Sequence, residues 1–207
     1  MKKAMTAALA VSFLGMFASE AMAQQTSPWL VRVRAVHMDT ANKSDPVGGA
    51  GPSDRLTVSN KTIPELDISY FFSPNIAAEL VLTYPQKHDV MLDGANIGSF
   101  KHVPPTLLVQ YHFMPEAQFS PYLGAGVNYT NISSVHLLDG GATLEHKSLG
   151  FALQAGLDYK IDSNWSFNVD IKKVQIGSDV LASGTGAKLS AVKVDPLLIG
   201  VGLGYRF

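Results

Sequence analysis

Charged residues recur inside segments that are otherwise apolar, and their types could carry out acid–base chemistry. Arg32 and Arg34 stand two positions apart, and so do Asp170 and Lys172. Two carboxylates held together can act as a general acid and a general base. Charges that leave water must be paired, however, and cations accompany the carboxylates here. We therefore expect a salt-bridged plug without catalysis, formed by Arg32, Arg34, Glu65, Asp67, Glu79, Asp158, Asp170, Lys172 and Arg206.

Histidine is the other residue type that could bind a metal or serve a hydrolase. No two histidines have the H-x-x-x-H or H-E-x-x-H spacing of a zinc site, and the chain has no G-x-S-x-G motif. We expect the loop histidines to lie in solvated segments. The sequence predicts no enzyme, no catalytic residue, no metal site and no cofactor, although it contains His37, His88, His102, His112, His136 and His146.

These charged and histidine residues belong to a chain with eight segments in which strand-forming side chains alternate with period two. Most segments are about 9–11 residues long, which is the length that a tilted strand needs to cross a bilayer. Strands of soluble proteins are usually shorter. The segments cover residues 29–37, 63–72, 76–84, 106–113, 121–131, 149–159, 165–174 and 197–207.

The connections between the segments alternate between short and long. The short ones read "SPN", "MPEAQFS" and "KIDSN" and are rich in turn-forming residues. The long ones cover residues 38–62, 85–105, 132–148 and 175–196. This alternation is typical of outer-membrane barrels, whereas a soluble periplasmic β-protein has no reason to sort its loops in this way. We therefore predict an all-β fold, an eight-stranded antiparallel transmembrane β-barrel with short periplasmic turns and long extracellular loops.

The two faces of the predicted strands differ in polarity. The face that includes Leu80 and Val127 carries no ionisable group except tyrosine, as lipid contact requires, because a Lys or Arg at the bilayer midplane costs roughly 2–4 kcal/mol. The predicted plug falls on the opposite face. An eight-stranded barrel encloses little more than its own side chains, so we expect a filled lumen and no wide pore.

The N-terminal stretch "MKKAMTAALAVSFLGMFASEAMA" combines two lysines, an apolar run and an A-x-A site. This pattern predicts a secretory signal peptide over residues 1–23, followed by a single domain over residues 24–207. The chain has no cysteine, so no disulfide stabilises it. Its net charge of −1 gives no electrostatic basis for binding nucleic acid.

Three prolines flank one predicted external hairpin. Pro85 ends the third strand, while Pro104 and Pro105 precede the fourth, within "FKHVPPTLLVQYHF". Proline has no N–H for a β-ladder. The prolines either simply end the strands or mark an opening in the wall. The lining of such an exit would include Val103, Leu107 and Leu108, with Leu56, Val58, Met91 and Leu92 contributed by loops.

The blocks "HVPPTLLVQYHF", "SPYLGAGVNYT", "ISYFFSPNIAAELVLTYP" and "GLGYRF" resemble the OmpW family of outer-membrane proteins. The resemblance covers essentially the whole predicted mature chain. It implies a barrel with an apolar outer passage for small hydrophobic molecules, a closed polar base and a lateral exit into the membrane. The terminal aromatic Phe207 resembles the signal by which the barrel-assembly machinery recognises such chains.

We therefore expect passive uptake of small hydrophobic solutes through the cell outer membrane, in contact with membrane lipids and lipopolysaccharide. The alternative is a non-transporting surface barrel whose external loops serve as a receptor for phage, bacteriocin or host surfaces. The sequence leaves both functions open.

Overall fold

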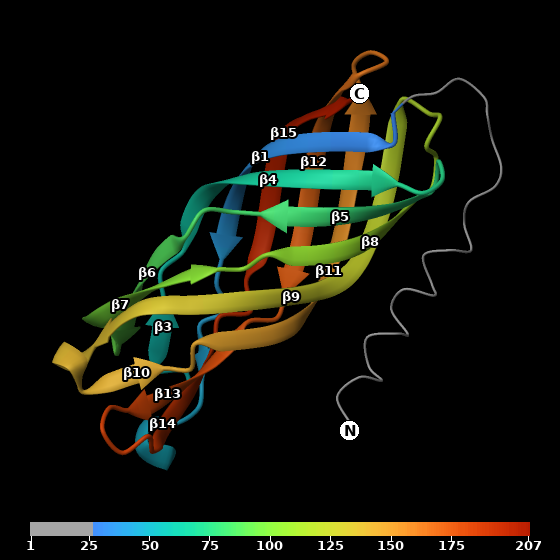
Figure 1. Cartoon of the computed structure of the whole chain (residues 1–207). Helices are drawn as coiled ribbons and strands as arrows, with labels where there is room; N and C mark the ends of the chain where they lie inside the picture. Colours follow the sequence, from blue (N-terminus) through green and yellow to red (C-terminus); the bar gives the residue numbers. More distant parts are fainter. Residues whose placement is uncertain (1–26) are drawn as a thin grey trace, which may run out of the picture.

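The structure, a computed structural model, describes residues 27–207, and the predicted signal peptide lies outside this range. Within it, eight long strands form a closed antiparallel barrel (Figure 1). The barrel closes because β1 pairs with both its neighbours, β4 and β15. The eight strands are β1 (Trp29–Asp39), β4 (Lys61–Phe71), β5 (Ile76–Leu82), β8 (Thr106–His112), β9 (Phe119–Leu137), β11 (Lys147–Lys160), β12 (Trp165–Val174) and β15 (Leu197–Arg206).

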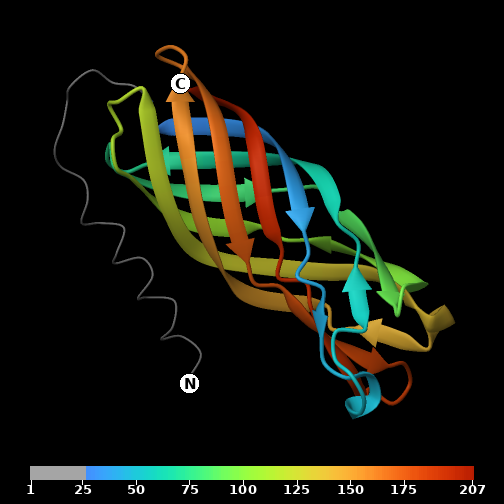
Figure 2. The same cartoon turned by 180° about the vertical axis from the view of Figure 1, so that it is seen from behind.

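The connections are short at one end of the barrel, here called the turn end, and long at the other, the loop end. The long connections, predicted as extracellular loops, contain strands that continue the wall (Figures 1 and 2). Strand β9 exemplifies this continuation, because it pairs first with β8 and then with β7. The added strands are β2 (Lys43–Ser44), β3 (Leu56–Val58), β6 (Gln86–Leu92), β7 (Ala95–Val103), β10 (Ala142–Leu144), β13 (Gly177–Ala182) and β14 (Lys188–Lys193), with single helical turns η1 (Val47–Gly49) and η2 (Leu138–Gly140).

The outer surface of the barrel is an apolar belt, as the alternation predicted. Leu80 is 39% exposed and Val127 is 46% exposed, although both are large apolar side chains on central parts of their strands. Aromatic rings meet edge to face around the turn end, and Trp165, Tyr205 and Phe207 form one such chain with centroids 4.9–5.0 Å apart. Paired aromatic rings of this kind mark the membrane interface. No helix in the described range is long and apolar enough to span a membrane.

The inside of the barrel is divided into two zones along its length. Toward the turn end most inward side chains are charged or polar, apart from a small apolar group of Leu30, Phe71 and Ala77, and the side chains of the predicted plug lie here. Toward the loop end they are apolar, and Met38, Val81 and Leu108 join the buried side chains of the added strands in one continuous cluster. The same period-two pattern therefore places polar groups inside one half of the barrel and apolar groups inside the other.

Glycines on the inner face of β15 make room for the large cations. A Cβ at Gly202 would lie 2.7 Å from Arg34 Cγ, and one at Gly204 would lie 3.2 Å from Arg32 Cγ. A narrow barrel can hold the side chains of Arg32 and Arg34 because the neighbouring strand β15 has glycine at the two paired positions. The glycine pattern near the C-terminus thus serves packing inside the lumen.

Candidate functional site

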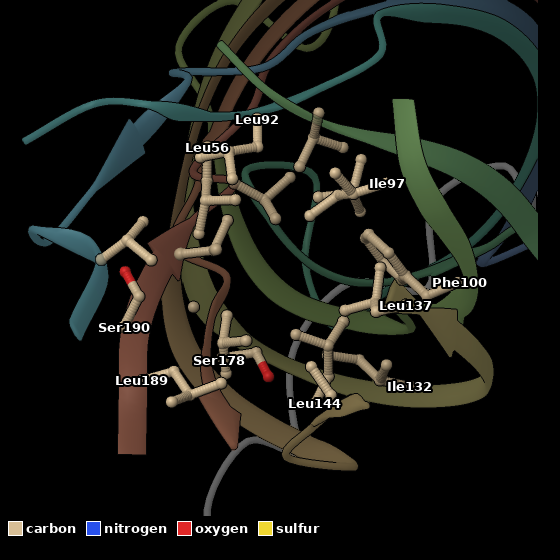
Figure 3. Close-up of a pocket in the computed structure, with 18 of the residues that line it drawn as sticks. Leu56, Leu92, Ile97, Phe100, Ile132, Leu137, Leu144, Ser178, Leu189 and Ser190 are labelled. Carbon is tan, nitrogen blue, oxygen red and sulfur yellow. The ribbon is translucent and has the colours of Figure 1, made fainter. Parts of the chain in front are cut away.

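The loop end encloses an apolar cavity of about 50 Å³. The added strands β3, β6, β7, β10, β13 and β14 and the far end of β9 converge on it (Figure 3). Leu56, Val58 and Leu92, three of the residues predicted as loop contributors, line this cavity. Met91 does not line it and is half-buried on the other parity of β6. We call this space the outer cavity.

The plug below the cavity is a dense ion-pair network. Arg32 contacts Glu79 at 2.7 Å and Asp158 at 2.6 Å. Arg34 lies within 3.4 Å of four carboxylates, those of Glu65, Asp67, Glu79 and Asp170. Lys172 contacts Glu65 at 2.6 Å and Asp170 at 3.0 Å. Every carboxylate of the predicted plug therefore touches a cation, and all these groups are at most 6% exposed.

Arg206 stands apart from this network. Its guanidinium lies 4.1 Å from the ring centroid of Phe71, and its Nε donates to the carbonyl of Ser27. The ring of His112 lies between those of Phe71 and Tyr122, with centroids 4.9 Å from each. Phe71, His112 and Arg206 occupy the turn end of the lumen beneath the plug, whereas the hydroxyl of Tyr122 reaches into the plug and donates to Asp170.

The wall of the barrel is interrupted at residues 83–85, between β5 and β6. The β5–β8 ladder ends at the pair Val81 and Thr106. The same two chain segments pair again, as β6 and β7, only from Gln86 and His102 onward. On the other side, the β4–β5 ladder ends at Leu66, and β4 continues through Pro64 with no ladder partner on that edge. Residues 83–85 are therefore not paired to a strand on either side.

The residues predicted to line a lateral exit lie in different parts of the structure around this interruption. Pro104 is buried and lines a small second cavity, of about 20 Å³, between the plug and the outer cavity. Leu108 is fully buried on the inner face, whereas Leu107 is 51% exposed on the outer face. Val103 and Pro105 are half-buried, and Pro85 is exposed. On the β9 side Asn128 closes the seam, donating to the carbonyls of Pro104 and Pro105 at 3.1 and 3.2 Å.

The prediction that the loop histidines are solvated is wrong for two of them. His88 and His102 are fully buried on the inner face of the β6–β7 hairpin. The rings meet edge to face with centroids 4.8 Å apart. Sequence reasoning missed this pair because it treated residues 85–105 as loop. The sequence signal that could have revealed this strand is the alternation in residues 86–90, where Gln86, His88 and Val90 share one parity. All three prove to be buried.

The described part of the chain brings no three His, Cys, Asp or Glu side chains together where they could hold a metal ion. The carboxylates of the plug are engaged by cations as described above. The arrangement can therefore exclude ions and water from the base of the barrel while offering an apolar surface at the loop end.

Comparison with known proteins adds relatives over nearly the whole chain. The chain is 42% identical to an uncharacterized outer-membrane protein, y4mB, of Sinorhizobium fredii, over 92% of this chain and 84% of that one. It is 32% identical to outer membrane protein W of Escherichia coli, over 100% of each chain. It is also 24% identical to the dibenzothiophene metabolism operon protein PahQ of Pseudomonas aeruginosa, over 88% and 90% of the two chains.

A solved structure has the same architecture. The crystal structure of the outer membrane protein OprG from Pseudomonas aeruginosa matches with a TM-score of 0.75 and 28% identity, covering 88% of this chain and 97% of that chain. The model of the OmpW family matches residues 26–207. The chain therefore belongs to the OmpW family and is a β-barrel of the cell outer membrane.

Proposed function

We propose that this protein carries small apolar solutes passively into the outer membrane, without chemical transformation. The observation that carries the proposal is the division of the lumen, with an apolar cavity at the loop end above a buried ion-pair plug. Transfer from water to an apolar surface is favourable by about 0.8 kcal/mol per CH₂ group. An apolar solute thus gains free energy when it enters from outside.

The plug makes the direct route through the barrel unfavourable. A solute passing through it would have to separate Arg32 and Arg34 from their carboxylates, and breaking a buried ion pair costs roughly 3–5 kcal/mol. The downhill route leads sideways into the bilayer. We place this lateral exit at residues 83–85, where the wall has no ladder pairing, beside Pro104 and Pro105.

The added strands largely enclose the outer cavity, and we propose that they separate when a solute enters. Short ladders hold them: β3 pairs with β6 over three residues, and β14 with β2 over two. Such short pairings open at low free-energy cost. The name of PahQ ties that relative to dibenzothiophene metabolism, which is consistent with an apolar aromatic solute here.

Uptake of a radiolabelled apolar solute, such as naphthalene, tests the proposal in cells that differ only in this protein. The expected result is a faster initial rate in cells that contain the barrel. Equal rates would overturn the transport function and favour the alternative, a surface barrel recognised through its external strands. In both cases membrane lipids surround the apolar belt, and we propose Phe207 as the contact of the barrel-assembly machinery.

A further inference from the structure

A group of buried polar side chains lies beside the interruption in the wall, between the outer cavity and the plug. It consists of Thr83, Gln86, His88 and His102, here called the histidine cluster. Five of its side-chain atoms are buried without a hydrogen-bond partner among residues 27–207: Thr83 Oγ1, Gln86 Oε1, His88 Nε2 and both ring nitrogens of His102. Leaving a buried polar atom unpaired costs about 1–3 kcal/mol, so five in one place require an explanation.

The cluster lies between the two cavities of the loop end, although Gln86, His88 and His102 line neither of them. The ring of Phe100, which lines the outer cavity, lies 5.8 Å from the rings of both His88 and His102. Thr83 lines the small cavity that also contains Pro104. On the proposed route, a solute that moves from the outer cavity toward the interruption at residues 83–85 comes past this cluster, between Phe100 and Thr83.

The hydrogen-bond roles of two of the free atoms follow from their neighbours. His88 Nδ1 lies 2.9 Å from the carbonyl oxygen of Ser59, which can only accept, so Nδ1 carries the proton. Burial lowers the pKa of His88 and lowers that of His102 to about 3, so both rings are neutral at physiological pH. His88 Nε2 is therefore an acceptor.

The amide of Gln86 gives the second assignment. Its Nε2 donates to the carbonyl of Tyr84 at 2.8 Å, which leaves Oε1 free as an acceptor. A neutral His102 ring adds one acceptor and one donor, and Thr83 adds a hydroxyl. The free atoms thus include two that can only accept, and their complement is a group that donates a hydrogen bond.

We propose that the histidine cluster binds the hydroxyl group of an alcohol or phenol whose apolar part occupies the passage. This inference rests on the proposed uptake function and specifies its substrate class. An O–H group can donate to His88 Nε2 or Gln86 Oε1 and accept from Thr83 or His102. A hydrocarbon satisfies none of these atoms, and an ether or ester can only accept, so both leave the two obligate acceptors unpaired.

The test compares three probes of matched shape: 4-hexylphenol, 4-hexylanisole and hexylbenzene. The measured quantity is the initial uptake rate in cells with the protein minus the rate in cells without it. We expect the phenol-to-anisole ratio of these rates to fall about three- to tenfold in His88→Phe, which removes one of the two obligate acceptors, since one hydrogen bond is worth roughly that factor. Hexylbenzene uptake should stay unchanged in this variant, because the change removes no apolar surface.

Gln86→Leu removes the other obligate acceptor and should lower the same ratio, so it provides a second test if His88→Phe does not fold. The matched control is His136→Phe, the same change at an exposed position of β9, which should leave the ratio unchanged. Heat-modifiable migration on gels checks that each variant forms a barrel. In lipid nanodiscs, 4-hexylphenol should also shift the imidazole ¹⁵N signals of His88, and 4-hexylanisole should not.

The outcomes separate the two proposals. Protein-dependent uptake of hexylbenzene with equal phenol-to-anisole ratios in the wild type and both folded cluster variants would refute hydroxyl recognition and leave the passage in place. No protein-dependent uptake of any probe would overturn the proposed function and, with it, this inference.

Discussion

The guanidinium of Arg32 binds the carboxylate of Asp158 through two hydrogen bonds, 3.2 Å from Nε and 2.6 Å from Nη2, although 126 positions separate the residues in the chain. A third hydrogen bond, of 2.7 Å, joins Arg32 to Glu79. The pairing of Arg32 with both carboxylates thus connects strands β1, β5 and β11 across the interior of the barrel. Bidentate pairs of this kind are among the strongest hydrogen bonds in proteins.

Replacing Arg32 by Ala should lower the free energy of unfolding by about 3–5 kcal/mol, because Asp158 and Glu79 would lose a buried partner. Denaturant unfolding of the barrel in lipid measures this. The control is Lys43→Ala, which removes an exposed pair with Asp54 and should cost no more than about 1 kcal/mol. Equal losses in the two variants would contradict a dry plug, as would a large ion conductance of the wild type.

Gly156→Ala should disturb the plug without removing any charge. A Cβ at this position would lie 2.2 Å from Cζ of Tyr122, whose hydroxyl hydrogen-bonds Asp170 at 3.2 Å and Asn168 at 3.1 Å. The ring must move, so the melting temperature should fall. Gly177→Ala is the control, because its nearest neighbour would be 3.6 Å away. Indistinguishable melting temperatures for the two variants would show that the lumen has room for a methyl group beside Tyr122.

Leu80→Arg should block assembly of the barrel in the membrane, since a cation at the bilayer midplane costs roughly 2–4 kcal/mol. Ser53→Arg, an exposed change outside the barrel strands, should assemble normally. Heat-modifiable migration of the outer-membrane fraction measures both. If Leu80→Arg assembled as well as the wild type, this face of β5 would not contact lipid.

The β6–β7 hairpin should lose stability as the pH falls from 8 to 5. Burial lowers the pKa of His102 from 6.5 to about 3, so unfolding lets this ring take up a proton below pH 6.5. The stability that the hairpin gains from a neutral, buried His102 is complete above pH 6.5. It decreases as the pH falls toward 3 and is smaller by about 2 kcal/mol at pH 5. His88 acts in the same direction, because burial lowers its pKa; Lys61 lowers this pKa further, while the hydrogen bond to the Ser59 carbonyl and the charge of Asp89 raise it.

Hydrogen exchange of the hairpin amides at pH 8 and pH 5, corrected for intrinsic rates, measures this loss. The pH dependence should be smaller in His102→Phe than in the wild type. An opening free energy that is the same at both pH values in the wild type would contradict the burial of these rings.

The barrel was predictable because its determinants are local. Period-two alternation and turn residues mark β12 and β15 almost to the residue, and the charged positions follow from the same parity. The strands of the loop end were not predictable in this way. Strand β10 has three residues, and its pairing with β13 depends on partners some 40 positions away. The parity of Gln86, His88 and Val90 indicates a strand, but the hairpin that buries His88 and His102 also depends on its pairing with the distant strands β3 and β9.

The central claim is that apolar solutes leave sideways through the interruption at residues 83–85. If the β5–β8 ladder continued past Val81 and Thr106, Thr83 would face Pro104. The chain has no cysteine, so a Thr83→Cys and Pro104→Cys pair can form one defined crosslink there. A second pair, Ala78→Cys and Val109→Cys, crosslinks a row that is already closed and serves as the control.

The decisive measurement is the protein-dependent uptake rate of hexylbenzene with each pair oxidised and then reduced. We expect oxidation of the Thr83–Pro104 cysteine pair to reduce uptake to the rate of cells without the protein and reduction to restore it. The Ala78–Val109 cysteine pair should have no effect in either state. Equal uptake by the oxidised and reduced forms of the Thr83–Pro104 pair would contradict an exit through this wall.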